Sequence, residues 1–520
     1  MSPSRRGLVS QLLEGIMHEQ AEHRVEDDDS DEHGANLKIS MANLRSLLSP
    51  IHQLPPELLI KIFRLICAST WLRISETPQI VNLTFVCGRW REIALSTPSL
   101  WADIDFSTAR WLGKYGFESK EPQNDLPRLV RVVRLFLARS QRAPLNLSLS
   151  LYDFDESSPD IVDLMDLVAT TKERWRAFSF NESLFNQLEH SSSGQLCRPS
   201  PLSLESLTLA LSMHRPLSGM TPDPRPLLQG FESCTSLISL SLIASSGQYW
   251  SRLSLPWRQI TKLQISSIDA FSLGEMLKKT PELKELCVLS VTFTSNPETG
   301  SWISPISHAR LEYLDLGYQT DVPSTLRHFT FPRLSSLLLP CDEAEDPWNH
   351  SHFTEFLERS SCTVTHLRVN TSSGPNILRL FPRLKSLYVE EVVQSTSSSN
   401  DDIFTEAFLH QFFELIFTSR ESSSSPLPYL SQLTDLTLIY VDAEFDIDHL
   451  VNAISTFSTP WGVPDRLQRR NLRLNIEYIV DRARRSENEL TPLKELEALE
   501  ILRDVVPGLS LSIELFRNRD

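Results

Sequence analysis

The chain has 520 residues, of which 41% are hydrophobic and 22% charged, so it is long enough for two or more domains or one extended repeat array. Its formal net charge of -16 argues against nucleic acid and anionic membranes as partners, because both bind clustered Lys and Arg. Its seven cysteines are scattered and form no CxxC pair, which predicts neither a zinc site nor a disulfide framework.

Residues 1–40 are polar and contain the acidic run VEDDDSDEH, from Val25 to His33. Such a charge block buries too little apolar surface to fold, so a disordered acidic tail is expected there. The N-terminus matches a signal peptide poorly, and no apolar run reaches the roughly 18 residues of a membrane-spanning helix. We therefore expect a cytoplasmic or nuclear location and no membrane partner.

Two segments between residues 50 and 105 have the apolar spacing of short helices. In LPPELLIKIFRLI, from Leu54 to Ile66, two prolines suit a helix entry and Glu57 lies in the first turn. In the second segment one helical stripe is expected to carry Leu83, Val86, Cys87, Trp90, Ile93 and Ala94. Fewer than about fifty residues rarely bury a stable core alone, so part of this apolar surface must contact another domain or another protein.

The ordered residues of these two segments resemble the F-box family. That family has a Leu-Pro start, an acidic residue, Leu or Ile, and Ile-Phe, followed by a Val-Cys-x-x-Trp-Arg block and a closing Leu-Trp. The matching residues are Leu54, Pro55, Glu57, Leu58, Ile62, Phe63, Val86, Cys87, Trp90, Arg91, Leu100 and Trp101. The link between the two blocks, Cys67 to Gln79, is longer than usual, as in a large fungal branch of the family.

The resemblance implies a partner for residues 50–105, since F-boxes dock on the SKP-type adaptor of a cullin-RING (SCF-type) ubiquitin ligase. The residues that it implies for the adaptor-facing surface are Leu54, Pro55, Leu58, Ile62, Val86, Cys87 and Trp90. Aromatic and aliphatic anchors in a desolvated patch supply most of the energy of such interfaces. Cys87 is expected to be a small buried hydrophobe rather than a reactive thiol.

Beyond residue 120 a hexad of the form φ-x-x-φ-x-φ recurs, where φ is apolar. Between the copies that begin at Leu204 and Leu384 the steps are 33, 23, 23, 28, 23, 30 and 20 residues, close to the spacing of leucine-rich repeats. The copies are WRAFSF (weak, from Trp175), LESLTL (Leu204), LISLSL (Leu237), ITKLQI (Ile260), LKELCV (Leu283), LEYLDL (Leu311), LSSLLL (Leu334), VTHLRV (Val364), LKSLYV (Leu384), LTDLTL (Leu433) and LEALEI (Leu496).

Each hexad is expected to form one strand, because its last two φ positions are two residues apart and point to the same side. Apolar stripes between the hexads, such as Leu273, Met276 and Leu277, predict helices that pack on the strands. The fold expected is α/β: a short three-helix F-box module, then a leucine-rich-repeat-like strand-helix solenoid over residues 120–520. The array is degenerate, since the Asn or Cys of the regular repeat is missing, and Ser-rich loops are expected near residues 393–402 and 421–426.

A segment from Leu129 to Ser140 is expected to form a helix that leads into a first strand, Pro144 to Leu151. The basic run RRNLR, from Arg469 to Arg473, is interpreted as a solvated surface rather than a binding patch. Neither segment changes the expected repeat organisation, which rests on the hexads.

In a solenoid the outward residue of each strand lines the binding face. Four of these residues, Gln264, Asp315, Arg368 and Tyr388, are candidates to bind a target protein by charge and stacking. The full set of outward residues is Thr208, Ser241, Gln264, Cys287, Asp315, Leu338, Arg368, Tyr388 and Thr437.

The motifs of the common catalytic and phosphate-binding sites are missing: GxSxG, GxxxxGK[ST], GxGxxG and HExxH. His350 and His352 are expected in a loop rather than at a metal. The sequence thus favours a non-catalytic substrate receptor without cofactor, catalytic residues or metal ligands. The alternatives are an interaction scaffold that acts outside a ligase, and an enzyme whose site has no recognisable motif.

Overall fold

The computed structural model describes two compact units, one within Met1–Phe106 and Pro127–Leu145 and the other within Ser107–Leu126 and Asn146–Asp520. The expected Ser-rich loops, and the expected acidic tail apart from 11–12 and 14, lie outside the described residues. The described residues are 11–12, 14, 51, 54–67, 78–107, 126–150, 159–181, 203–211, 231–244, 253–292, 306–317, 325–339, 350–370, 375–390, 406–417, 430, 432–441, 472–480 and 509–517.

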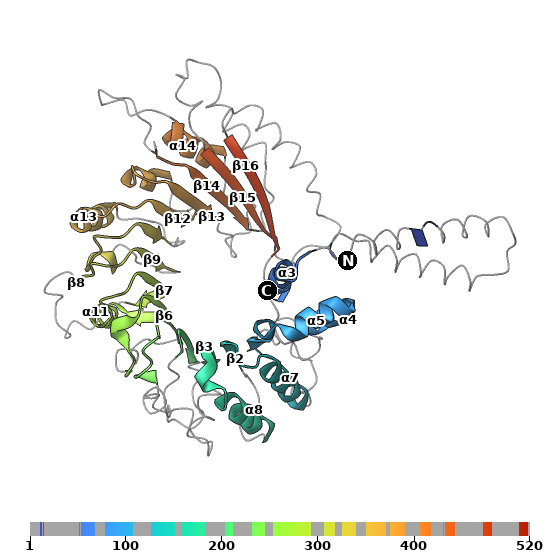
Figure 1. Cartoon of the computed structure of the whole chain (residues 1–520). Coiled ribbons are helices and arrows are strands. Elements are labelled where there is room, and N and C mark those ends of the chain that lie inside the picture. Colours follow the sequence, from blue (N-terminus) through green and yellow to red (C-terminus); the bar gives the residue numbers. More distant parts are fainter. Residues whose placement is uncertain are drawn as a thin grey trace, which may run out of the picture. The chain divides into compact units, whose positions relative to one another are not determined.

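The first unit is built from short helices (Figure 1). Pro78 precedes α4 and Pro98 opens η2, because proline fits the first turn of a helix. The elements are α3 (Pro56–Cys67), α4 (Gln79–Val86), α5 (Gly88–Ser96), the 3-10 helix η2 (Pro98–Trp101) and α7 (Leu126–Arg139), with β1 (Asp103–Ser107) after η2.

The second predicted apolar stripe is not one continuous helix. At Cys87 the backbone becomes extended, with φ −161° and ψ 168°, and this separates α4 from α5. The Cys87 thiol then caps α5 by accepting a hydrogen bond from the Trp90 amide at 3.5 Å. The break turns Val86 toward solvent, while Leu83, Ile93 and Ala94 remain buried.

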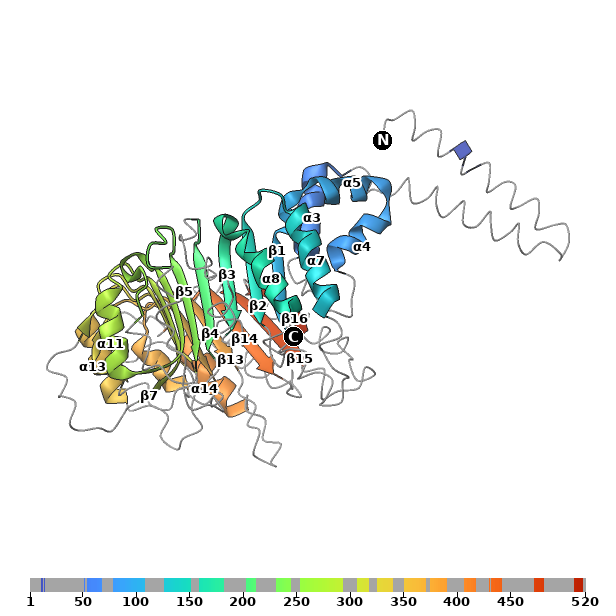
Figure 2. The same cartoon turned by 90° about the horizontal axis from the view of Figure 1, so that it is seen from below.

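In the second unit strands alternate with helices or short turns (Figures 1 and 2). Short 3-10 turns, η5 (Lys172–Arg174), η9 (Trp257–Gln259) and η11 (Pro375–Leu380), take the place of some helices. The helices are α8 (Pro159–Ala169), α11 (Ala270–Lys279), α13 (His350–Ser360) and α14 (Glu406–Phe417). The strands are β2 (Leu145–Ser150), β3 (Trp175–Asn181), β4 (Ser206–Leu211), β5 (Ser239–Ala244), β6 (Lys262–Asp269), β7 (Glu285–Thr292), β8 (Ile306–Ser307), β9 (Tyr313–Leu316), β10 (Phe329–Thr330), β11 (Ser336–Leu338), β12 (His366–Asn370), β13 (Ser386–Glu390), β14 (Asp435–Val441), β15 (Leu472–Val480) and β16 (Leu509–Arg517).

A long parallel sheet runs through this unit, in the order β2-β3-β4-β5-β6-β7-β9-β11-β12-β13-β14-β15-β16. The hexads from Trp175 to Leu433 each contribute one strand to it, as the sequence predicts. Their fourth positions pair across the sheet, for example Leu263 with Leu286 and Leu286 with Leu314. Since these positions are buried, the register aligns the apolar side chains in one continuous core.

A ladder of hydroxyl groups joins successive hexads at their second position. Thr261, Ser335, Thr365 and Thr434 each donate a side-chain hydrogen bond to a backbone carbonyl of the preceding copy, at 3.1–3.2 Å. In each of these four cases the accepting carbonyl belongs to the second position of that copy, such as Ile238 for Thr261. Each of these carbonyls also accepts two backbone amides of the following copy, so the hydroxyl adds to an existing backbone pairing where the strands begin.

The structure bears on two further expectations, and a third falls outside it. His350 and His352 lie in the first turns of α13, not in a loop, because Phe353 and Phe356 anchor this segment as an amphipathic helix. The basic run ends inside a strand, since β15 begins at Leu472, and Arg473 is exposed on it. The last predicted hexad, from Leu496, lies outside the described residues.

Candidate protein-binding surfaces

Helix α3 is amphipathic and buries only one of its two apolar stripes. Leu59 and Phe63, four residues apart, are fully buried. The other stripe carries Leu58, Ile62, Leu65 and Ile66; Ile62 is half-buried, and the other three are exposed. A surface helix normally turns its polar residues outward, so this stripe is available to a further apolar partner.

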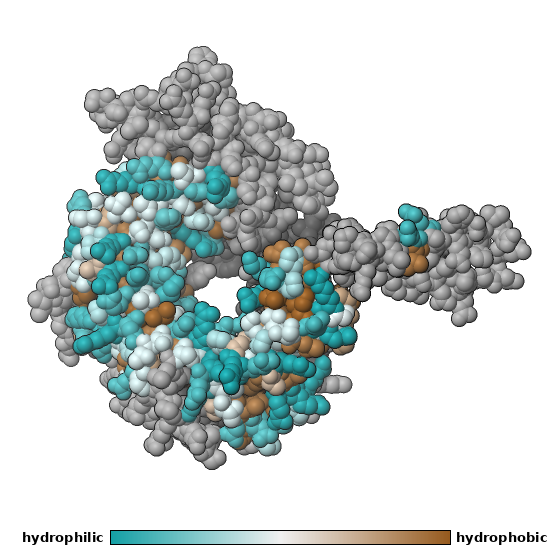
Figure 3. All heavy atoms as spheres, in the orientation of Figure 1, coloured by the Kyte–Doolittle hydropathy of each residue, from teal (hydrophilic) through white to brown (hydrophobic). Residues whose placement is uncertain are grey.

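The end of α4 adds a second group of exposed apolar side chains. Phe85 is 70% exposed and Val86 58%, and Leu65 on α3 reaches 78%. Hydrophobic residues gather at the surface over α3 in the space-filling view (Figure 3). Exposed apolar patches on soluble proteins commonly mark interaction sites. We call Leu58, Leu65, Ile66, Phe85 and Val86 the apolar patch.

Trp90 holds the helices of this region together from α5. Its ring packs on Phe63 with centroids 4.9 Å apart. Its indole Nε1 is buried and has no hydrogen-bond acceptor among the described residues. The carbonyl of Leu54, just before α3, accepts a hydrogen bond from Arg89 at 2.5 Å. Trp90 and Leu54 therefore brace the helices that carry the apolar patch.

The seven residues inferred for the adaptor-facing surface lie in or next to α3, α4 and α5, and none of them is enclosed. Pro55, Leu58 and Val86 are exposed, whereas Leu54, Ile62, Cys87 and Trp90 are half-buried. Sequence reasoning missed Leu65 and Phe85, the two most exposed members of the patch. The spacing 58, 62, 65, 66 could have identified Leu65, because it is one helical stripe.

The nine outward residues predicted for the hexad strands form a single row across the sheet. Consecutive members pair directly, as Gln264 with Cys287, Cys287 with Asp315, and Arg368 with Tyr388. The helices α8, α11, α13 and α14 lie on one side of the strands (Figure 1), and because the positions that alternate with the row, such as Leu263 and Leu286, are buried, the row points to the other side. We call the side with the row the open face.

Charges on the open face are mostly paired across neighbouring strands. Lys262 meets Glu285 at 2.8 Å, and the Arg368 guanidinium donates to one oxygen of Glu390 at 2.6 and 3.0 Å. Burial lowers the pKa of Arg368, but the charge of Glu390 more than offsets this and keeps the pKa above its usual value. The charges of Lys262 and Arg368 are therefore already paired with carboxylates of this chain.

Asp315 has a different environment, because its neighbour in the row is a thiol. The Cys287 Sγ donates to Asp315 Oδ2 at 3.3 Å. Burial raises the pKa of the Asp315 carboxyl, and the thiol and Arg368 lower it by less. Burial, followed by the charge of Asp315, raises the pKa of Cys287 to about 12. The thiol is thus neutral and unreactive at neutral pH.

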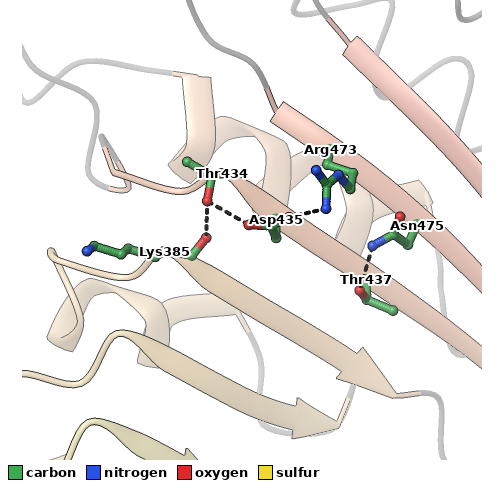
Figure 4. A network of polar contacts seen from close by, with 6 residues as sticks. All are labelled: Lys385, Thr434, Asp435, Thr437, Arg473 and Asn475. Atoms are coloured by element: carbon green, nitrogen blue, oxygen red, sulfur yellow. Dashed lines mark hydrogen bonds and ion pairs between the residues drawn. The ribbon is translucent and has the colours of Figure 1, made fainter.

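At the β14 end of the row, polar side chains of neighbouring strands contact one another (Figure 4). Asn475 on β15 donates to the Thr437 hydroxyl at 3.4 Å, and Thr437 is buried, so its side chain is not free to bind a target. Beside them the Thr434 hydroxyl lies 2.7 Å from Asp435 Oδ2, which is an alternative acceptor to the Lys385 carbonyl, and Arg473 lies 3.5 Å from Asp435. The accessible members of the row are those nearer its middle, including Gln264 and Tyr388, which are exposed.

The described residues contain no group of three or more side chains suited to hold a metal ion. Among the same residues, no helix combines the length and apolar character needed to cross a bilayer. Residues 51–107 match the F-box-like domain family, a span that includes α3, α4, α5, η2 and β1. A search among curated proteins finds none that matches this chain. An F-box-like domain is therefore present at residues 51–107, and such domains generally bind SKP-type adaptors.

Proposed function

We propose that the chain is a substrate receptor of an SCF-type ubiquitin ligase. Residues 51–107 dock on the SKP-type adaptor, and the parallel-sheet unit, as a leucine-rich-repeat-like solenoid, holds a target protein on its open face. The chain itself performs no chemistry. It raises the effective concentration of the target beside the ubiquitin-charged enzyme, which makes transfer nearly intramolecular.

The apolar patch is the observation that carries this proposal. It lies inside the span that matches the F-box-like family, and its side chains point to solvent in the lone chain. A specific interface buries roughly 1,600 Å² in total, with a few apolar or aromatic anchors at its centre. Leu58, Leu65 and Phe85 have the chemistry of such anchors.

The paired hexads support the solenoid half of the proposal. Successive strands keep one register from β3 to β16, and the hydroxyl ladder repeats with the hexads. A strand-helix unit buries its apolar face only against its neighbours, which is the organisation of a repeat array.

Binding to purified SKP-type adaptor tests the docking half. Leu58→Ala combined with Val86→Ala should weaken binding at least about tenfold, since each removes an exposed anchor worth about 1 kcal/mol or more. Leu135→Ala is the matched control, because Leu135 on α7 is 42% exposed and Leu58 is 43% exposed. Equal affinities for the double variant and wild type would refute the docking assignment.

A further inference from the structure

The middle of the open face places an acid, an aliphatic side chain, a base and an aromatic ring on four consecutive strands. Asp315 on β9 pairs with Leu338 on β11, Leu338 with Arg368 on β12, and Arg368 with Tyr388 on β13. Tyr388 is exposed, and the other three are half-buried. The two ends of this group therefore differ in chemistry: Asp315 presents a carboxylate, and Tyr388 presents an aromatic ring.

The charges along β6 to β13 on this face do not balance. Among the described residues of these strands, in the row and at the positions two residues before and after it, the cations are Lys262 and Arg368 and the carboxylates are Glu285, Glu390 and Asp315, so their formal sum is minus one. Two of the carboxylates are matched, because Glu285 pairs with Lys262 and Glu390 with Arg368. Asp315 is left with the neutral thiol of Cys287 as its hydrogen-bond partner.

The position of Asp315 is unfavourable in the lone chain. Burial raises the pKa of its carboxyl, which means that the charged form loses hydration that the thiol and Arg368 do not replace. A half-buried carboxylate in this state gains most from a cation that arrives with its own hydrogen-bond donors. Lys and Arg side chains provide both.

We propose that Asp315 receives a Lys or Arg side chain from an extended segment of the target protein, that this segment crosses Leu338, and that Tyr388 holds an apolar side chain of the same segment. This inference rests on the proposed function, in which the open face holds the target. It identifies the class of target segment as basic followed by apolar.

The strand spacing sets the separation of the two target residues. Adjacent strands lie about 4.8 Å apart, so Asp315 and Tyr388, three strands apart, are separated by about 14 Å. An extended segment rises about 3.4 Å per residue, so four residues cover this distance. The apolar residue is therefore expected four positions from the Lys or Arg.

An acidic or phosphorylated segment would need Arg368 instead. The Nε and Nη2 groups of Arg368 are both bonded to Glu390. An incoming anion would have to displace that carboxylate and would approach the unmatched charge of Asp315. The charge pattern therefore favours a basic segment.

The experiment uses the full chain bound to its adaptor and three pools of fluorescent eleven-residue peptides with random flanks. One pool fixes Lys at the centre and Leu four positions later, the second replaces Lys by phosphoserine, and the third replaces Leu by Ser. The first pool should bind tightest, and Asp315→Asn should weaken it about tenfold. Glu285→Gln, which alters a carboxylate already paired with Lys262, should leave it unchanged. Preference for the phosphoserine pool, lack of preference for the first pool, or equal binding by Asp315→Asn would overturn the proposal.

Adaptor binding, measured on the same samples, separates this proposal from the proposed function. Asp315→Asn should retain wild-type adaptor affinity, because Asp315 lies on the second unit and the docking residues on the first. A chain that binds adaptor but does not select the basic pool contradicts only the peptide specificity. A chain that selects the basic pool but does not bind adaptor contradicts the ligase role.

Discussion

The ring of Phe63 on α3 packs against the ring of Trp90 on α5, with centroids 4.9 Å apart and ring planes inclined at 59°. Phe63 is fully buried, whereas Leu65, two residues later on the same helix, is 78% exposed. One helix therefore uses its two faces differently: Phe63 stabilises the unit, and Leu65 remains available to a partner. The predictions that follow separate these two roles.

Trp90→Ala should destabilise the first unit by about 3–5 kcal/mol, because it removes the ring that covers Phe63 and leaves a cavity. Trp90→Phe should cost much less, since it keeps an aromatic ring and the lost Nε1 group has no acceptor among the described residues. Urea unfolding followed by tryptophan fluorescence or circular dichroism measures both. A similar cost for the two variants would contradict the packing role.

Gly317→Ala should destabilise the sheet by about 1–3 kcal/mol, as overpacked sites do. A Cβ there would lie 2.7 Å from the Cα of Leu289 and 3.0 Å from its carbonyl oxygen, so backbone would have to move. Gly88→Ala is the control, because a Cβ at Gly88 meets nothing within 4 Å and alanine favours the helix that begins there. Thermal unfolding of both variants measures the contrast, and a neutral Gly317→Ala would show that the strands are more widely separated.

Asp315→Asn should stabilise the chain at pH 7, and the gain should disappear as the pH falls toward about 4. The pKa of Asp315 is raised on folding, so the folded chain holds this proton more tightly than the unfolded chain. The contribution of Asp315 to the free energy of unfolding therefore falls as pH rises from the unfolded pKa through the folded pKa. Urea unfolding at several pH values measures the free energy of unfolding of both chains. The control is Glu285→Gln, which loses the ion pair with Lys262 and should show no gain in stability. A loss of stability for Asp315→Asn at pH 7 would reverse the sign and refute the argument.

Cys287 should be alkylated very slowly by iodoacetamide in the folded chain. With its pKa raised to about 12, by burial and then by Asp315, its thiolate fraction at pH 8 is about a thousandfold below that of an ordinary cysteine. Asp315→Asn should speed the reaction, because it removes the neighbouring charge. Mass spectrometry of the labelled peptide gives the rate, and rapid labelling of wild-type Cys287 would contradict the described environment.

The strands of the sheet were predictable from the sequence because each hexad repeats one physical requirement. A residue such as Leu263 must be buried at the same depth as Leu286, and this produces both the spacing and the register. The last strands were not found, because the hexads that align with their neighbours begin with Asn471 for β15 and Gly508 for β16 instead of an apolar residue. The hydroxyl ladder was missed as well, since Thr261 and Thr365 look like ordinary polar positions until the strands are paired.

The candidate surfaces were only partly predictable. The row that contains Asp315 and Arg368 follows from strand alternation alone, but the pairing of Arg368 with Glu390 depends on side-chain geometry across two strands. On the F-box-like domain the spacing of apolar residues gave the stripes of α3. It did not show which stripe is buried, because that depends on the placement of Phe63 against Trp90.

The most direct measurement of the central claim is hydroxyl-radical footprinting of the full chain with and without the SKP-type adaptor. The side chains of Leu65 and Phe85 should be oxidised readily in the lone chain, since they are 78% and 70% exposed, and protected when adaptor is added. Leu135 should be oxidised equally in both samples. If Leu65 and Phe85 react at the same rate with and without adaptor, the apolar patch is not the adaptor-binding surface.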